Sequence, residues 1–128
     1  MDLSKTLMGT LGIEIVEVCE GRVVATMPVD HRTHQPMGLL HGGASVALAE
    51  TVASLGGYTM VDDEKEAVVG LEINANHLKS KREGLVTATG NIIHRGKKTM
   101  VWEIKITDEE NELICISRCT LAVIQIKK

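Results

Sequence analysis

Glu50 is the residue whose surroundings most strongly indicate chemistry. Its neighbours at helical spacing, among them Val46, Ala47, Ala53 and Ser54, are almost all small or apolar, and no Lys or Arg lies within four positions. Burying an unpaired carboxylate costs several kcal/mol, so such a residue indicates a base or nucleophile poised by desolvation. The alternative is that Glu50 faces solvent from one wet edge of its helix.

A pair of glycines, Gly42 and Gly43, precedes Glu50 at the expected start of the same helix. Glycines there leave backbone N–H groups open to a ligand at the positive end of the helix dipole. Such donors suit a carbonyl oxygen that gains negative charge during a reaction. The alternative is that the pair only eases a tight turn into the helix.

The spacing between the two features has a consequence for assembly. Gly42 and Glu50 are separated by about 12 Å along a helix, at ~1.5 Å per residue. A Glu side chain cannot span that distance to a carbonyl held at the start of its own helix. If both groups act on one carbonyl, they come from different subunits, which predicts an obligate dimer with two shared sites.

Two hydroxyl groups near Glu50 are secondary candidates. Ser54 lies one helical turn beyond Glu50 on the same face and could hold a water molecule or orient the carboxylate. Its alternative is a hydroxyl that bonds back to the backbone carbonyl of Glu50. Thr51 is the other candidate.

The pattern along the chain predicts one helix and a long antiparallel sheet. Residues 41–57 read as a helix of about 14 residues, apolar almost all round and therefore enclosed on every side, with a glycine pair as its C-terminal cap. Strands are expected at residues 12–19, 22–28, 67–78, 84–93, 99–107 and 113–125, and a short helix at 4–8. Short turns between successive strands predict antiparallel neighbours. The expected architecture is a single α+β domain over residues 1–128, with the sheet wrapped around the helix.

Composition excludes several classes of function. With 128 residues the chain has room for one domain, and its net charge of −3 does not favour nucleic acid. There is no Phe, one Tyr and one Trp, so base-stacking platforms are missing. No apolar stretch approaches the ~20 residues of a membrane-spanning helix. The N-terminus lacks the pattern of a signal peptide, and the three cysteines form no Cys-x-x-Cys pair, so we expect a reduced, cytoplasmic setting without membrane or nucleic-acid partners.

Two segments carry a family resemblance. Residues 35–51, QPMGLLHGGASVALAET, closely resemble the motif of hotdog-fold thioesterases with a catalytic glutamate. That group includes one type of 4-hydroxybenzoyl-CoA thioesterase and the phenylacetate-pathway thioesterases. Residues 70–77, GLEINANH, look like the branch that contains the enterobactin proofreading thioesterase and the 1,4-dihydroxy-2-naphthoyl-CoA hydrolases. The likeness covers nearly the whole chain.

The resemblance implies a hotdog fold and hydrolysis of an acyl-CoA thioester to free acid and thiol. By position it implies that Glu50 is the nucleophile or general base and that the Gly42 N–H polarises the carbonyl. Gln35 and His41 would orient the substrate or form hydrogen bonds near the carbonyl, and Ser54 would assist water.

The resemblance also extends to the binding of the acyl group and to assembly. His77 would line the acyl pocket from the sheet. The assembly implied is a homodimer or a homotetramer built as a dimer of dimers, with no metal and no cofactor beyond the CoA of the substrate.

Two basic clusters in predicted turns are candidates for the CoA phosphates, because cations and backbone N–H groups in such loops suit phosphate. The resemblance supports this role; the alternative is a solvated charged turn. The first cluster is residues 79–82, KSKR, and the second is residues 94–99, HRGKKT. The candidates for binding are Lys81 and Arg82 in the first cluster, and His94, Gly96, Lys97, Lys98 and Thr99 in the second.

Other chemistries have weaker support. His31 and His34 form a His-x-x-His pair near His41, but no cysteine or carboxylate stands at ligand spacing, so no metal site is expected. The sequence around Ser45 fails the Gly-x-Ser-x-Gly pattern, and nothing beyond its presence supports Cys119 as a nucleophile.

Alternatives to the hydrolase remain at this point. The same fold could hydrate or dehydrate an acyl thioester, pairing His41 with Glu50, or the chain could be a non-catalytic acyl-CoA sensor. The acyl group is open among aryl, medium-chain and carrier-protein-bound forms, and the resemblance favours an aromatic acyl-CoA.

Overall fold

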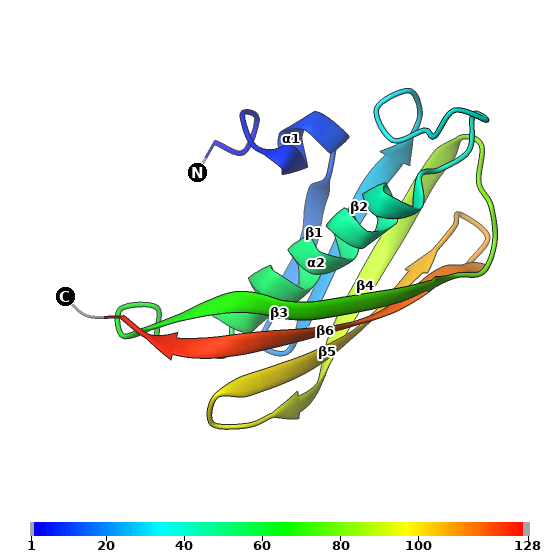
Figure 1. Cartoon of the computed structure of the whole chain (residues 1–128). Helices are drawn as coiled ribbons and strands as arrows, with labels where there is room; N and C mark the ends of the chain where they lie inside the picture. The colour runs from blue at the N-terminus through cyan, green and yellow to red at the C-terminus, as the bar shows by residue number, and fades with distance from the viewer. Residues whose placement is uncertain (1, 127–128) are drawn as a thin grey trace.

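The computed structural model describes residues 2–126 and consists of a curved sheet that partly surrounds one long helix (Figure 1). The elements in chain order are α1 (Leu7–Leu11), β1 (Glu14–Cys19), β2 (Arg22–Val29), α2 (Gly42–Tyr58), β3 (Glu66–His77), β4 (Gly84–Arg95), β5 (Thr99–Thr107) and β6 (Leu113–Gln125). The strands form a six-stranded sheet in the order β1-β2-β4-β5-β6-β3, and all neighbours are antiparallel. The predicted α+β class and the antiparallel sheet around a helix are confirmed.

The predicted strand bounds are close to those observed. The bounds 99–107 and 113–125 match β5 and β6, and each end of the other strands lies within two residues of its prediction. The short helix is wrong by three residues, because α1 spans Leu7–Leu11 instead of 4–8. Gly12 ends it in a left-handed conformation with φ of 76°, which a glycine adopts without strain.

The link between β3 and β4 departs from the expectation that short turns join neighbouring strands. Residues 78–83 connect β3, at the edge of the sheet, with β4, three positions away in the strand order. Six extended residues reach about 20 Å, which is enough to cross three strand spacings of ~4.8 Å. The crossing passes over the end of the sheet where α2 begins (Figure 1). Among residues 2–126, one long side of β3 is therefore left without a partner strand.

Helix α2 has one buried stripe and one open stripe. Ala44, Leu48, Val52 and Ala53 pack against the concave face of the sheet and are buried. Residues 46, 47, 50, 51, 54 and 55 lie on the other side and are half-exposed. The prediction of a helix enclosed on every side is therefore wrong for the single chain.

The glycine pair near the end of α2 serves packing and does not cap the helix. Both Gly56 and Gly57 lie inside α2, which continues to Tyr58, and Thr59 caps it in a right-handed conformation. A Cβ atom on Gly56 would collide with the indole ring of Trp102, which is fully buried in the core. The glycines therefore allow the helix to approach the sheet closely.

Within residues 2–126, none of the helices combines the length and the apolar character that crossing a membrane requires. The three cysteines are not paired in disulfides.

Candidate active site

The start of α2 is shaped by His41, which is the N-cap residue. The backbone N–H of Gly43 donates a hydrogen bond to Nδ1 of His41 at 2.8 Å. Because Nδ1 accepts this hydrogen bond, the ring is oriented with its Nε2–H free to donate. Among residues 2–126 the N–H of Gly42 has no hydrogen-bond partner. Two donors, Gly42 N–H and His41 Nε2–H, are thus available at the positive end of the helix.

His77, near the end of β3, lies directly over this helix start. A Cβ atom on Gly42 would come within 2.9 Å of Nε2 of His77, so the glycine makes room for the ring. A cavity of about 390 Å³ opens here. It is lined by Gln35, Leu39, Leu40, Gly42, Ser45, His77, Leu78, Lys79, Ser80 and Ile114. We call it the helix-start cavity.

Gln35 contributes an amide donor to the helix-start cavity. Its Oε1 accepts the backbone N–H groups of Met37 and Leu39, and its own backbone N–H donates to the carbonyl of Leu39 at 2.7 Å. Because the side-chain oxygen is used within its loop, the Nε2 group is left to donate to a ligand. The loop before α2 therefore fixes the amide in one orientation.

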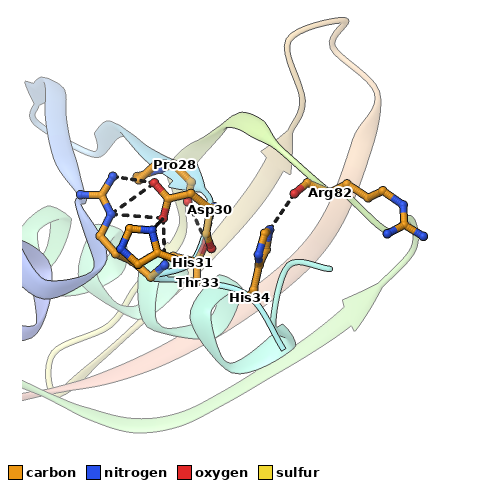
Figure 2. A network of polar contacts seen from close by, with 7 residues as sticks. Pro28, Asp30, His31, Thr33, His34 and Arg82 are labelled. Atoms are coloured by element: carbon orange, nitrogen blue, oxygen red, sulfur yellow. Dashed lines mark hydrogen bonds and ion pairs between the residues drawn. The ribbon is translucent and has the colours of Figure 1, made fainter. Parts of the chain in front are cut away.

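The wall formed by residues 78–84 is anchored to this same loop. Nε2 of His34 donates to the carbonyl of Arg82 at 2.7 Å, as Figure 2 shows, and the N–H of Leu40 donates to the carbonyl of Lys81 at 2.8 Å. His34 is therefore an anchor of the wall, a role that its sequence spacing to His31 did not suggest. Within residues 2–126 no three metal-ligating side chains cluster.

The first basic cluster is partly neutralised by the β5–β6 turn. Nζ of Lys81 pairs with Glu109 at 2.5 Å, and Lys79 pairs with Glu112. The hydrogen bond from Lys81 lowers the pKa of Glu109 to about 2, helped by backbone N–H donors that include Leu85. In the described part of the chain Arg82 forms no ion pair, so its guanidinium group is available to a ligand.

Glu50 lies in a second cavity, of about 400 Å³, on the open stripe of α2. The lining residues are Leu7, Met8, Ala47, Glu50, Thr51, Ser54 and Leu55. We call it the carboxylate cavity. Across residues 2–126 the carboxylate makes no hydrogen bond and no ion pair, and its Oε2 rests against the backbone of Gly70 in β3. Glu50 is half-exposed in the single chain. This matches the alternative reading of the sequence, in which Glu50 faces solvent from one edge of its helix.

The hydroxyl groups beside Glu50 are arranged differently from each other. Oγ1 of Thr51 donates to the carbonyl of Ala47 at 2.7 Å and is therefore occupied. Ser54 makes no side-chain hydrogen bond within the described residues, so the expected alternative, a bond back to Glu50, is not found. Its hydroxyl is available to a ligand or water in the carboxylate cavity.

Cys119 lies on β6 below this region and is fully buried. Burial raises the pKa of its thiol to about 11, and the nearby carboxylates of Glu50 and Glu72 add to the effect. The thiol therefore stays protonated near neutral pH and is a poor nucleophile. Ser45 is also buried and borders the helix-start cavity.

No residue of the second basic cluster lines either cavity. His94 and Gly96 belong to the hairpin between β4 and β5, whose far end lies opposite the 78–83 link across the length of the sheet (Figure 1). The N–H of Gly96 bonds the carbonyl of Thr99 at 2.8 Å, which closes the turn. Lys97 and Lys98 are exposed. The two basic clusters are thus not brought together within one chain.

The two cavities share no lining residue. Gly42, Gln35 and His77 line the helix-start cavity, whereas Glu50 and Ser54 lie farther along α2 on its open side. His41 lines a neighbouring cavity of about 280 Å³, which shares Leu7 and Ala47 with the carboxylate cavity. This separation agrees with the helical spacing read from the sequence, which keeps Gly42 and Glu50 apart within one chain.

The comparisons with known proteins identify the class. The sequence profile of the Thioesterase superfamily matches residues 37–115, more than half of the chain. The chain is 59% identical over 117 residues to a 1,4-dihydroxy-2-naphthoyl-CoA hydrolase of Listeria monocytogenes, covering 91% of this chain and 94% of that protein. It is 49% identical over 118 residues to the enzyme of the same name from Escherichia coli, with coverage of 92% and 86%.

A solved structure gives the same answer for the fold. The thioesterase HI1161 of Haemophilus influenzae superposes with a TM-score of 0.93 at 52% identity, covering 98% of this chain and 87% of that chain. The chain therefore belongs to the Thioesterase superfamily and has the hotdog fold, as the resemblance predicts. It is a thioester hydrolase.

Proposed function

We propose that this protein hydrolyses acyl-CoA thioesters, with 1,4-dihydroxy-2-naphthoyl-CoA or a similar aromatic acyl-CoA as the substrate. The observation that carries the proposal is the division of one chemistry between two cavities: free N–H donors in one and an unpaired carboxylate in the other. The names of the relatives from Listeria monocytogenes and Escherichia coli support the aromatic acyl group. Leu7, Met8 and Leu55 give the carboxylate cavity an apolar lining suited to it.

The free edge of β3 supports a dimer. This strand of 12 residues ends the sheet, and its apolar side chains Val69 and Leu71 are 44% and 60% exposed. A long apolar edge strand is a template for pairing with another chain. Antiparallel pairing of β3 with the same strand of a second copy would run the two α2 helices in opposite directions. The carboxylate cavity of one subunit would then face the helix-start cavity of the other.

In the proposed reaction the thioester carbonyl accepts the N–H of Gly42, while His41 Nε2–H and the Gln35 amide donate nearby. His77 borders the acyl group from the same subunit. Glu50 of the partner subunit acts on the carbonyl carbon from the other side. Hydrogen bonds that strengthen as the oxygen becomes negative stabilise the transition state.

Two routes give the same products. Glu50 can take a proton from water, whose oxygen adds to the carbonyl before the C–S bond breaks; Ser54 then orients that water. Alternatively a carboxylate oxygen of Glu50 attacks directly, expelling CoA thiolate and leaving a mixed anhydride that water hydrolyses. In both routes the thiolate gains a proton and the acid is released, so the chemistry needs only Glu50, the donors and water. Single turnover in oxygen-18 water tests for the anhydride, because water that hydrolyses it at the carboxyl carbon of Glu50 leaves label in Glu50, whereas the general-base route never does.

The CoA moiety needs cations, and the dimer would supply them from both chains. An antiparallel pair would bring the 94–99 hairpin of one subunit toward the 79–82 end of the other. We propose that Arg82, Lys97 and Lys98, with His94, Gly96 and Thr99, hold the nucleotide phosphates, and that Lys81 contributes when it leaves Glu109. A tetramer made of two such dimers, the cytoplasmic location and a carrier-protein substrate stay predictions.

Mixed dimers provide the decisive test of the shared site. Glu50→Ala and Gly42→Pro subunits, co-expressed with different tags, should each be inactive as homodimers. After random mixing, about half of the dimers are hybrids with one intact site, which gives about one quarter of wild-type activity. Hybrids without thiol release would contradict the shared site.

A substrate panel tests the reaction itself. Thiol release is measured with aryl, medium-chain and 3-hydroxyacyl CoA thioesters and with carrier-protein thioesters. Release from aromatic acyl-CoA at the highest kcat/KM is expected. Consumption of 3-hydroxyacyl thioesters without thiol release would indicate a dehydratase, and binding without turnover would indicate a sensor.

A further inference from the structure

The carboxylate of Glu50 occupies space that a side chain at position 70 would fill. A Cβ atom on Gly70 would lie 2.6 Å from Oε2 of Glu50, much closer than van der Waals contact allows. Figure 1 shows β3 running alongside α2, and the approach of Glu50 to Gly70 places this carboxylate where the helix borders the strand. The carboxylate has no hydrogen bond or ion pair among residues 2–126, so packing determines its position in the single chain, and Gly70 is part of that packing.

A bulge follows immediately in β3. Gly70 pairs with Leu121, and Glu72 with Thr120, so Leu71 is an extra residue in the strand. Side chains alternate between the faces of a strand, and one extra residue exchanges the faces for every residue beyond it. Gly70 and His77 are seven positions apart and would lie on opposite faces of a regular strand. With the bulge, His77 pairs with the buried Cys115 and faces the helix, as Gly70 does.

We propose that Gly70 is a positioning residue for the catalytic carboxylate: its missing side chain forms a socket that holds Glu50, and the bulge at Leu71 turns His77 back toward Gly42. One strand thereby sets the position of Glu50 in the carboxylate cavity and of His77 in the helix-start cavity. This inference rests on the proposed role of Glu50. Residues 70–77, GLEINANH, would then position Glu50 in addition to placing His77.

The substitution Gly70→Ala tests the socket with the smallest possible change. Gly70 is not among the described residues with positive φ, so alanine fits the backbone, and its methyl group meets only the movable end of Glu50. We expect kcat to fall about 10- to 100-fold, because a displacement near 1 Å can cost about 10²-fold. KM should change less than about twofold, since substrate binding uses other groups.

Thermal unfolding of four proteins separates positioning from ordinary packing. These are the wild type, Gly70→Ala, Glu50→Ala and the double variant. Gly70→Ala should lower Tm in the wild type and leave it unchanged or slightly higher in Glu50→Ala, where no carboxylate fills the socket. Glu50→Gln is the matched background, because its amide has the same shape as the carboxylate. In this background Gly70→Ala should still lower Tm.

Two results would overturn the inference: an equal loss of Tm in the Glu50→Ala and wild-type backgrounds, or an unchanged kcat in Gly70→Ala. Failure of the proposed function is a different result, since Glu50→Ala would then keep its thiol release. The Tm comparison would still decide whether Gly70 holds the carboxylate.

Discussion

The two cavities beside α2 are constructed in opposite ways. At the helix start, His41 caps Gly43, Gln35 is tied into its own loop, and His34 anchors the opposite wall at Arg82. In the carboxylate cavity, Glu50 has no polar partner in the described part of the chain. Backbone and amide donors can be fixed by their own subunit, because their other groups supply the hydrogen bonds that hold them.

The carboxylate differs because any strong partner in its own chain would occupy the oxygens that react. Its position is set instead by the shape of β3, and its environment would be completed by a second copy. We expect a site divided in this way to be inactive as a single chain, and its donors and its carboxylate can be tested separately.

The largest effect is expected at the carboxylate. Glu50→Gln keeps the shape of the side chain but removes the base or nucleophile, so kcat should fall by about 10²- to 10⁴-fold. Thiol release measured at saturating substrate checks this, with circular dichroism as the control for folding. Near-normal activity in Glu50→Gln would refute the assignment of Glu50.

At the helix start a slightly smaller effect should isolate one N–H group. Gly42 is the first residue of α2, where proline is tolerated, and His41 before it is extended with ψ of 130°. Gly42→Pro removes the donor, and kcat should fall by about 10²- to 10³-fold.

Gly42→Ala is the matched control, since it adds the same contact with His77 and keeps the N–H. The ratio of the two kcat values reports the donor alone. Equal losses in both variants would assign the effect to crowding of His77.

A weaker effect is expected at the 94–99 hairpin. Replacing both Lys97 and Lys98 by alanine should raise KM for acyl-CoA about fivefold, the scale of exposed ion pairs worth ~1 kcal/mol. An N-acetylcysteamine thioester, which lacks the nucleotide, should show no change. If both substrates respond equally, the hairpin does not bind the phosphates.

The smallest effect concerns the wall of the helix-start cavity. The pKa of Glu109 is lowered from 4.5 to about 2 by Lys81, so the native state binds its proton less readily than the unfolded state. The resulting stability is present above about pH 4.5 and is lost as the pH falls toward 2. The Tm difference between wild type and Glu109→Gln should therefore shrink over that range.

Glu110→Gln changes the same turn at a residue without an ion pair in the described part of the chain, and it serves as the control. A Tm difference for Glu109→Gln that is independent of pH would show that the ion pair with Lys81 does not stabilise the native state.

Local patterns were sufficient for much of the molecule. Alternation and turn residues predicted the bounds of β5 and β6, and the apolar run after Gly43 predicted the helix and marked Glu50. The spacing of Gly42 and Glu50 along that helix predicts that they come from two subunits if both act on one carbonyl. These properties depend on residues near one another in sequence, because local dihedral preferences and hydrophobic periodicity determine them.

Contacts between distant segments decided the rest. The sequence could not show that β3 leaves β4 for the edge of the sheet, because this depends on how the sheet curls around α2. From the sequence Gly56 is typical of a helix cap. In the structure it instead makes room for the ring of Trp102, which lies 46 positions later in the chain. The socket at Gly70 likewise exists because strand and helix approach closely.

By itself, the sequence determined that an unpaired acid would follow a glycine-rich helix start and that the two would be too far apart to act together. The tertiary structure alone decided which face of α2 stays open, what fixes the carboxylate and which strand edge is free. The physical reason is that helical spacing is a local property, whereas steric contact and strand order arise only when segments distant in the chain are packed together.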